Sequence, residues 1–459
     1  MRITVWVLVL YFSAGIVCAG ADEFQPHFDY PVGQNYYLTS VAVGDFNKDG
    51  YLDLVTADVL PSNVSVLLGR GDGAFLGYVD YATGMCPTAV TTGDFDEDGN
   101  LDLAVANACG TLSVLLGNGD GTFKSHQDYT TGMNSESLTV GDFNSDGRPD
   151  LATSNFSDDT VSVLLGNGNG TFQQHVDYVT GHFPAAVTTG DFNGDGKKDL
   201  AVVGGISPGA LSVLIGNGDG TFQAHVDYPT GPDPVSVVAR DLNGDGRIDI
   251  ATANYLGNTL SVLLANTDGT FQPEVEYRTG INPQSVVVAD FNGDGKLDLA
   301  GANFAGTVSV LWGNGDGTFQ SKVDYATGSK PTSVAVGDFN NDGTIDLLTA
   351  NNGDSTVSVL LNTGGTLVRR ASSPNPSTPG QTVTFTAQVI GREGTGTPTG
   401  TVTFKAGIHI LGTVTLVNGR ASLSTSGLAT GDHKITSYYS GDNVFNPNTA
   451  QPIFQQVLP

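Results

Sequence analysis

The chain repeats one eleven-residue stretch seven times, and the spacing of the copies constrains the fold more than any other feature of the sequence. The first copy reads Gly-Asp-Phe-Asn-Lys-Asp-Gly-Tyr-Leu-Asp-Leu over residues 44–54. The first aspartates of the later copies are 48 to 50 residues apart, at Asp94, Asp142, Asp191, Asp241, Asp290 and Asp338. A period of this length indicates a repeat architecture in which each unit packs on its neighbours.

Within each copy, side-chain oxygens stand at fixed positions of a tight loop. If Asp45 is position 1, Asn47 and Asp49 are positions 3 and 5, a glycine is position 6 and Asp53 is position 9. Position 7 can offer its main-chain carbonyl, which explains why its side chain varies. The glycine permits the positive φ that folds such a loop back on an ion. Ligands that are all oxygen suit a hard cation, and flexible coordination by about six to eight of them favours Ca²⁺ over Mg²⁺.

The sequence therefore predicts seven Ca²⁺ sites. Their predicted ligands are Asp45, Asn47, Asp49, Tyr51 and Asp53; Asp94, Asp96, Asp98, Asn100 and Asp102; Asp142, Asn144, Asp146, Arg148 and Asp150; Asp191, Asn193, Asp195, Lys197 and Asp199; Asp241, Asn243, Asp245, Arg247 and Asp249; Asp290, Asn292, Asp294, Lys296 and Asp298; and Asp338, Asn340, Asp342, Thr344 and Asp346. An isolated copy could be a surface turn rich in Asp, Asn and Gly. An EF-hand is the nearer alternative, but Thr56 occupies position 12, where a bidentate Glu belongs.

Between the loops, the sequence predicts four antiparallel strands per repeat. Alternating segments such as 40–43 precede the loop, segments such as 54–57 and 64–68 follow it, and a glycine-rich turn such as 117–123 leads to a strand that ends in Asp-Tyr. No segment has the apolar period of a helix. Seven such units would close as a β-propeller, with a linear solenoid as the alternative. The ends favour the ring, because the strand at 28–30 could complete the seventh blade.

These repeats resemble FG-GAP/VCBS repeats, the blades of integrin α-subunit heads, over residues 25–370. The resemblance implies Ca²⁺ in the hairpin between the first and second strands of each blade, with ligand-binding loops on the opposite face. Residues 371–381 are rich in Pro and Ser and are predicted to be a linker. Residues 382–459 contain alternating segments and resemble a bacterial group 3 Ig-like domain. The predicted fold class is all-β, a seven-bladed β-propeller followed by an Ig-like β-sandwich.

The N-terminus has the features of a secretory signal peptide over residues 1–20. Arg2 precedes an apolar run at 3–17, and small residues follow it. A membrane-anchoring helix is the alternative, although the run is short for a span. No later segment is long and apolar enough to cross a bilayer, so the mature chain is expected to be secreted, extracellular or on the cell surface. The formal net charge of −28 argues against a nucleic-acid partner, which needs a basic face.

Two cysteines beyond the signal lie in the second repeat. Cys86 precedes the first strand of that blade, and Cys109 lies in the loop between its second and third strands. These two loops would emerge on the same face of an antiparallel blade. A disulfide between Cys86 and Cys109 suits an exported protein and is the prediction; free buried thiols are the alternative.

Ligand recognition is predicted on the face away from the metal loops, because residues that recur in every blade are scaffold. The loops of that face carry Tyr36, Tyr37, Phe156, His182, Phe183, Tyr255 and Phe304, together with Asn35, Asn155, Asn254 and Asn303. Aromatic rings beside amides suit stacking against a sugar ring with hydrogen bonds to its hydroxyls. The alternative is that the rings fill gaps between blades.

The sequence favours a secreted Ca²⁺-binding propeller that recognises an extracellular protein or glycan ligand, in which Ca²⁺ is structural. A lectin with sugar pockets between blades is the first alternative. A polysaccharide lyase or lipid hydrolase is the second, since related propellers accompany such enzymes. No nucleophile, base and orienting group stand out together, so no catalytic residue is predicted.

Overall fold

A computed structural model describes residues 23–33, 37–363, 367–390, 396–407, 409–442, 445 and 448–458. The predicted signal peptide at 1–20 lies outside these residues. The described residues form strands and turns, and no helix among them could span a membrane. Residues Phe24–Gly364 form one compact unit, and a second unit contains Gly365–Pro459.

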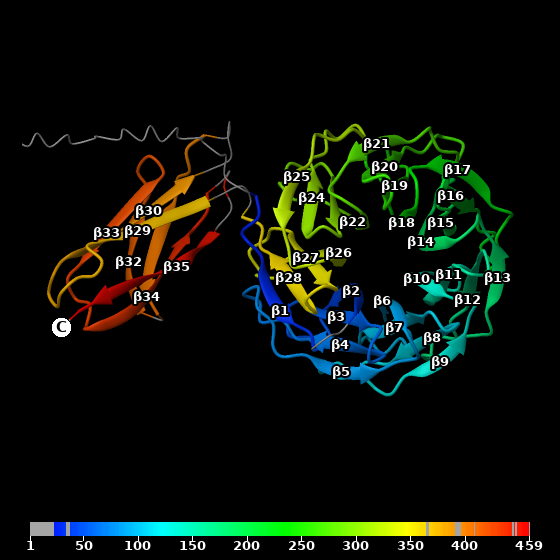
Figure 1. The fold of residues 1–459 in the computed structure, drawn as a ribbon, viewed down its shortest axis with the longest axis horizontal. Coiled ribbons are helices and arrows are strands. Elements are labelled where there is room, and N and C mark those ends of the chain that lie inside the picture. Colours follow the sequence, from blue (N-terminus) through cyan, green and yellow to red (C-terminus); the bar gives the residue numbers. More distant parts are fainter. Residues whose placement is uncertain are drawn as a thin grey trace, which may run out of the picture. The chain divides into compact units, whose positions relative to one another are not determined.

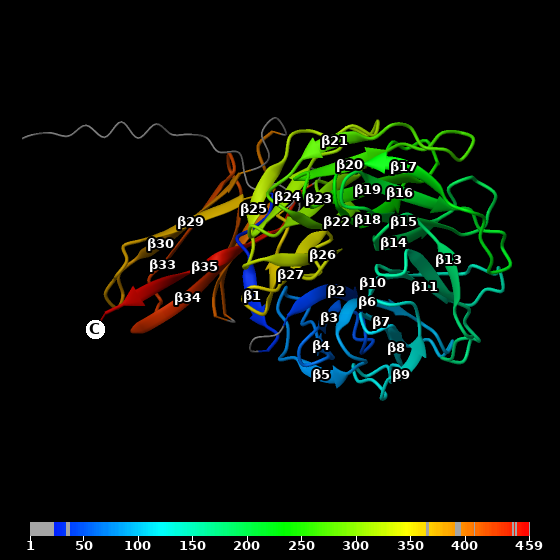
Figure 2. The same cartoon turned by 45° about the vertical axis from the view of Figure 1, so that its right-hand side comes forward.

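In the first unit the described residues form seven four-stranded antiparallel sheets around a ring, which confirms the predicted β-propeller (Figure 1). Blades 1 to 6 are β2 Leu38–Gly44, β3 Asp53–Asp58, β4 Asn63–Leu67 and β5 Val79–Ala82; β6 Pro87–Gly93, β7 Asp102–Asn107, β8 Thr111–Leu115 and β9 Gln127–Thr130; β10 Ser135–Gly141, β11 Asp150–Asn155, β12 Thr160–Leu164 and β13 Val176–Val179; β14 Pro184–Gly190, β15 Asp199–Gly204, β16 Gly209–Leu214 and β17 Val226–Thr230; β18 Pro234–Arg240, β19 Asp249–Asn254, β20 Thr259–Leu263 and β21 Val275–Arg278; and β22 Pro283–Ala289, β23 Asp298–Asn303, β24 Thr307–Leu311 and β25 Val323–Ala326. The first strand of each blade lies innermost, as Figure 2 also shows.

The seventh blade is completed by the N-terminal part of the chain. It contains β26 Pro331–Gly337, β27 Asp346–Asn351, β28 Thr356–Leu360 and, as its outer strand, β1 Phe28–Pro31. Strand β1 pairs antiparallel with β28, with Tyr30 opposite Val357. The prediction that the strand at 28–30 closes the ring is therefore confirmed.

Aromatic side chains pack the blades against one another. Phe46, in the metal loop of blade 1, makes an edge-to-face contact with Phe123 of blade 2 at a centroid distance of 5.5 Å. Tyr81, from the outer strand of blade 1, meets the same Phe123 ring at 5.4 Å. Such pairs add to the area that they bury. The recurrent Phe and Tyr residues are thus packing residues between blades.

Main-chain bonds also join four of the metal loops to the next blade. The glycine of the turn before the outer strand donates its N–H to the phenylalanine carbonyl of the preceding metal loop. Gly121 N lies 3.0 Å from Phe46 O, and Gly170 N lies 2.8 Å from Phe95 O. The same bond joins Gly220 to Phe143 and Gly73 to Phe339. The metal loops therefore help to hold neighbouring blades together.

A buried chain of hydrogen bonds crosses the strands of most blades. In blade 2, Asn107 Nδ2 donates to Ser113 Oγ at 2.9 Å, and Ser113 Oγ donates to Asp128 Oδ1 at 2.6 Å. The amide supplies a proton to the serine oxygen, and the serine proton is then available for the carboxylate. The Asn107 position is occupied by Asn in blades 2, 3, 5, 6 and 7.

Blade 1 has Asp58 at that position. Ser65 Oγ lies 2.6 Å from Asp58 Oδ2 and 2.7 Å from Asp80 Oδ1, and Thr56 Oγ1 donates to Asp58 Oδ1 at 2.9 Å. One serine proton cannot be given to two carboxylates, so both contacts are hydrogen bonds only when one carboxyl is protonated. Asp58 is fully buried, and burial raises its pKa to about 7, with nearby Asp80 adding to the effect.

Replacement of Asp58 by Asn is expected to remove one pH dependence of stability. The folded state binds this proton more tightly than the unfolded chain, whose Asp pKa is about 3.9, so wild-type stability falls as pH rises from about 4 to about 7. A shift of about three pKa units corresponds to roughly 4 kcal/mol. The advantage of Asp58→Asn over wild type should therefore grow by up to that amount across this window in denaturant unfolding. Asn107→Asp, the reciprocal change in blade 2, should introduce the same slope; parallel curves for all three proteins would contradict the assignment.

The second unit is a β-sandwich. One sheet contains β29 Leu367–Ser373, β30 Val383–Ile390 and β33 Arg420–Thr425; the other contains β31 Thr401–Ala406, β32 His409–Thr415, β34 Gly431–Tyr439 and β35 Asn448–Val457. Buried Phe385, Phe404, Ile435 and Tyr439 lie in its core.

The predicted linker at 371–381 is wrong for its first part. Ala371 and Ser373 belong to β29, where they lie opposite Thr386 and Thr384 of β30, and Ser377 N donates to Gln456 O at 2.9 Å. Strand β29 uses main-chain groups that β30 would otherwise expose at an edge. The predicted propeller boundary at residue 370 consequently falls inside a strand of the sandwich.

Candidate metal centres

The seven predicted metal loops all join the innermost strand of a blade to its second strand. In blade 1 the loop lies between β2 and β3, and in blade 2 between β6 and β7. Because the innermost strands share one direction around the ring, the loops lie at one end of the propeller. The five predicted ligand positions of each site are therefore brought together in one hairpin.

Hydrogen bonds to main-chain N–H groups order the side chains within each loop. Asp45 accepts from Asp49 N at 3.1 Å and from Gly50 N at 2.9 Å, and Asp49 accepts from Tyr51 N at 2.9 Å. Gly50 has a φ of 87°, a conformation that favours glycine. The two bonds to position 1 recur in all seven loops. The loop oxygens are thus held around a turn.

The carboxylate at position 9 lies at the base of each loop and is fully buried. Asp53 Oδ2 accepts from Phe46 N at 2.8 Å, and Asp53 Oδ1 accepts from Gly69 N at 2.7 Å. Each oxygen keeps a further lone pair. The residues at this position, all with both bonds, are Asp53, Asp102, Asp150, Asp199, Asp249, Asp298 and Asp346.

Burial raises the pKa of these carboxyls, and neighbouring loop carboxylates raise it further. The pKa of Asp53 is raised to about 6 by burial, with Asp49 and Asp45 adding to the shift. The pKa of Asp346 is raised to about 8, first by burial and then by Asp342 and Asp338. A bound divalent cation would oppose both causes, because it favours the charged form. The buried carboxyls therefore fit a cation site.

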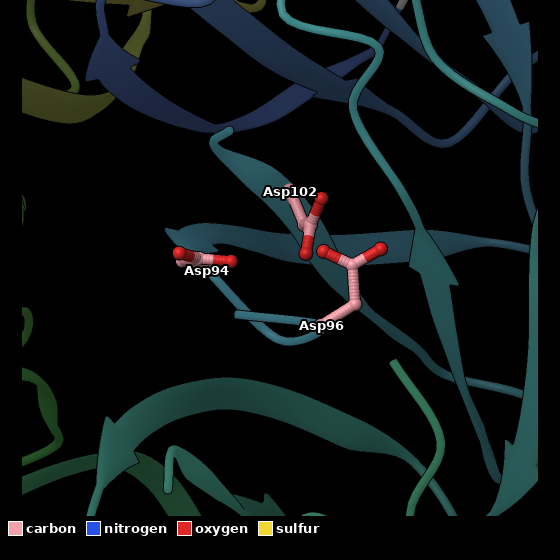
Figure 3. Close-up of side chains that lie close together, drawn as sticks. All are labelled: Asp94, Asp96 and Asp102. Carbon is pink, nitrogen blue, oxygen red and sulfur yellow. The ribbon is translucent and has the colours of Figure 1, made fainter. Parts of the chain in front are cut away.

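The second loop has an additional carboxylate. Asp96 replaces the usual Asn at position 3, and one oxygen each of Asp94, Asp96 and Asp102 lie within 4.8 Å of one another (Figure 3). Asp96 Oδ1 is buried without a hydrogen-bond partner among the described residues. Three acids converge in this way at no other place in the described ranges, and the other loops have a neutral amide at position 3.

The sequence did not predict one part of each site. This part is a main-chain N–H group, just after the third strand of the blade, that donates to the position-9 carboxylate. In blade 1 this group belongs to Gly69; the equivalents are Gly117, Gly166, Gly216, Ala265, Gly313 and Asn362. Their separation from the position-9 aspartate, 15 to 17 residues, is a signal that could have identified them.

The aromatic residues of the predicted ligand face differ in exposure, and their role in binding stays a prediction. Tyr36 lies outside the described residues. Tyr37 is 53% exposed and Phe183 is 42% exposed. Phe156, Tyr255 and Phe304 are half-buried. Phe156 and Phe183 form a tilted pair with a centroid distance of 5.2 Å.

The predicted role of the amides on this face is wrong for those that the structure describes. Asn155, Asn254 and Asn303 are fully buried. Each donates to a serine and a threonine of the next strand, as Asn155 does to Ser162 and Thr160. They belong to the hydrogen-bond chain within the blades, and Asn35 lies outside the described residues.

The structure places a cavity on the face opposite the metal loops. It has a volume of about 350 Å³ and is lined by Phe156 and by the second residue of every innermost strand: Thr39, Thr88, Glu136, Ala185, Val235, Gln284 and Thr332. Burial raises the pKa of Glu136, the acidic residue of this lining. The sequence did not predict this cavity, because it forms only when all seven strands meet.

The predicted disulfide between Cys86 and Cys109 is wrong, because both residues are free thiols. The two loops do emerge on one face, where Ala108 N donates to Cys86 O at 2.9 Å. Burial, with a smaller contribution from Cys109, raises the pKa of Cys86.

Comparison with known proteins agrees with this architecture. The FG-GAP-like repeat family matches residues 45–105, 94–153, 152–202, 191–252, 241–301 and 290–349, and the bacterial Ig-like domain (group 3) family matches residues 370–458. No curated protein matches the chain.

Solved structures show the same fold at low sequence identity. BBS1N, crystallised in complex with ARL6DN, is 15% identical with a TM-score of 0.51, and the match covers 74% of this chain and 97% of that one. A protein from Lactobacillus plantarum is 16% identical with a TM-score of 0.50, over 64% of this chain and 86% of that one. Seven blades with recurring loops, and family matches across most of their length, lead to one conclusion: the chain belongs to the FG-GAP-like repeat family.

Proposed function

We propose that this protein is an extracellular recognition module whose propeller is stabilised by Ca²⁺ and whose opposite face binds a protein or glycan ligand. FG-GAP-like repeats and Ig-like domains are typical of extracellular, adhesion-type proteins. The observation that carries the proposal is the buried aspartate at position 9 of every loop, placed beneath further oxygen donors. The calcium and the ligand each need their own test.

The residues of the loops fit Ca²⁺. Side chains at positions 1, 3, 5 and 9 and the carbonyl at position 7 would hold the ion with oxygen alone, which suits a hard cation. The positive charge of bound Ca²⁺ would keep the buried position-9 carboxyl ionised. It would also reduce the repulsion within a chain of net charge −28.

The ligand is proposed to bind at the cavity and the aromatic residues beside it. Phe156 lines the cavity and contacts Phe183, so a continuous surface leads from Glu136 to an exposed ring. This pair of rings favours a glycan as the second candidate, since an aromatic face can stack on a sugar ring while the carboxylate accepts hydrogen bonds from hydroxyls. A screen of glycans and extracellular-matrix proteins, with and without Ca²⁺, would identify the class.

Phe183→Ala is expected to weaken binding of any ligand found in that screen. Val179→Ala, which truncates a 66% exposed side chain on the outer strand β13, is the matched control. Equal binding by both variants would contradict the proposed surface. Turnover of a polysaccharide in the same screen would support the enzymatic alternative instead.

Asp245→Ala is expected to remove one Ca²⁺ from the protein and leave the other sites titratable. Asp245 occupies position 5 of the loop in blade 5, where it accepts from Arg247 N at 2.9 Å. Asp268→Ala is the control, because Asp268 accepts from Thr270 N at 3.1 Å in a glycine-rich turn outside the metal loops. Elemental analysis after equilibration in Ca²⁺ should show one equivalent fewer for Asp245→Ala alone. An equal loss in both variants would argue against a site at this loop.

A further inference from the structure

All sulfur-bearing residues that follow Cys18 in the sequence lie in three neighbouring turns of the propeller. They are Met85, Cys86, Cys109 and Met133. Cys86 directly precedes β6 and Cys109 lies between β7 and β8, both in blade 2, while Met133 lies in the turn before β10 of blade 3. Blades 2 and 3 are adjacent in the ring (Figure 1). These turns are on the face away from the metal loops.

Main-chain hydrogen bonds hold the three turns against one another. Ala108 N donates to Cys86 O at 2.9 Å, which fixes the turn of Cys109 beside Cys86. Asn134 N donates to Ala108 O at 2.9 Å, and Thr131 N donates to Gly110 O at 3.1 Å. The segment that carries Met133 is thus bonded on both sides of Cys109. The main-chain positions of Cys86, Cys109 and Met133 are therefore set by the blade framework.

These turns carry two thiols that influence each other and a thioether that lies over Gly110. Cys86 and Cys109 are free, and Cys109 is close enough to Cys86 to raise the pKa of its thiol. Met133 Sδ lies over Gly110, only 3.1 Å from the point that a Cβ on this glycine would occupy. Gly110 follows Cys109 directly, so the thioether lies over the residue that neighbours Cys109 in the chain. Cys109 is exposed and Met133 is 54% exposed, so an ion can reach them from solvent.

We propose that Cys86, Cys109 and Met133 form a site for a soft monovalent metal ion, Cu(I). Two thiolates and a thioether are ligands that Cu(I) prefers, whereas Ca²⁺ prefers the oxygens of the opposite face. Binding releases both thiol protons to solvent and forms two Cu–S(thiolate) bonds with no change of oxidation state. The site does not depend on the proposed Ca²⁺ loops.

Met85 offers a matched control for Met133. It occupies the same position of the turn in blade 2, Gly84-Met85-Cys86, as Met133 does in Gly132-Met133-Asn134 of blade 3. Its turn is bonded to blade 1, since Thr83 N donates to Ser62 O at 3.2 Å and Cys86 N donates to Ser62 Oγ at 3.3 Å. Met85 is 67% exposed, and the loop of blade 1 to which its turn is bonded, residues 59–62, contains no thiol.

The test is a titration of the reduced full-length chain with Cu(I) under anaerobic conditions, in competition with bicinchoninate. One Cu(I) per chain is expected for wild type, and none for Cys86→Ser or Cys109→Ser. Met133→Leu should weaken Cu(I) binding by at least about tenfold. Loss of a residue that only supports the ligands already costs this much, and Met133 is proposed as a ligand. Met85→Leu should bind as wild type. Unchanged melting temperatures of the four variants would show that they are folded.

Two further measurements keep the outcome interpretable. Because two protons leave per ion, Cu(I) affinity should rise as pH increases through the neutral range. Ag(I), which is soft and does not oxidise thiols under these conditions, should bind with the same pattern across the variants. Binding that survives both serine substitutions would overturn the proposal. So would equal effects of Met85→Leu and Met133→Leu, or loss of free thiols once the metal has been removed by chelation.

Discussion

Removal of calcium with a chelator is expected to lower the melting temperature of the propeller by tens of degrees. An ion that binds only the folded state stabilises it by about 1.4 kcal/mol when its free concentration is tenfold above the Kd. Seven independent sites would contribute on the order of 10 kcal/mol, comparable to the stability of a whole domain. The measurement is calorimetry in Ca²⁺ and in EDTA, with Mg²⁺ added to the EDTA sample as a control for ionic strength.

The second unit provides an internal control for this experiment. The predicted loops all lie between Asp45 and Asp346, in the unit Phe24–Gly364, so the β-sandwich has none of them. Its unfolding transition should stay at the same temperature in EDTA while that of the propeller moves. A propeller transition that does not shift, or equal shifts of both transitions, would exclude structural calcium in the loops.

Removal of residues 1–31 is expected to abolish the cooperative unfolding transition that the propeller shows in the full-length chain. The deletion removes β1, and with it all four residue pairs with β28. It also removes Phe24, which is 3% exposed and packs edge-to-face on Phe291 and Tyr325 at 5.7 and 5.1 Å. Loss of a buried Phe side chain alone costs about 3 to 5 kcal/mol. Strand β28 would be left as an exposed edge, which favours association.

Calorimetry and size-exclusion chromatography would measure these effects. A synthetic peptide covering residues 24–33 should restore part of the lost stability in trans, because it can supply the missing strand. A scrambled peptide of the same composition is the control. A truncated chain that melts like wild type, or rescue by both peptides, would show that β1 does not close the ring.

The blade architecture could be predicted from the sequence because its signals are local and repeated. Asp45, Gly50 and Asp53 form their turn within nine residues, and the step of 48 to 50 residues leaves room for four short strands. The position of β1 followed from an extra Asp-Tyr strand before the first metal loop and the lack of one in the seventh unit. Such features need no knowledge of distant contacts.

The predictions that failed depended on strand pairing and register, which the composition of a segment does not reveal. Asn155 carries an amide that could equally face solvent, and only the register with β12 places it against Ser162. Ala371 lies in a segment with the composition of a linker, yet this segment pairs with the edge of β30 and becomes strand β29. The cavity beside Glu136 requires the ends of seven strands, and no single repeat contains it.

The hydrogen bonds from the glycine turns to the phenylalanine carbonyls couple the order of a metal loop to that of the neighbouring blade. Phe46 follows directly after Asp45, so the carbonyl that anchors Gly121 of the next blade moves with the loop that would grip the ion. In the four loops that make this bond, occupancy of the loop is thereby coupled to the order of the turn in the next blade around the ring. Four such bonds link the loops of blades 7, 1, 2 and 3 to blades 1, 2, 3 and 4 in turn, so disorder in one of these loops can pass along an arc that includes the blade completed by β1.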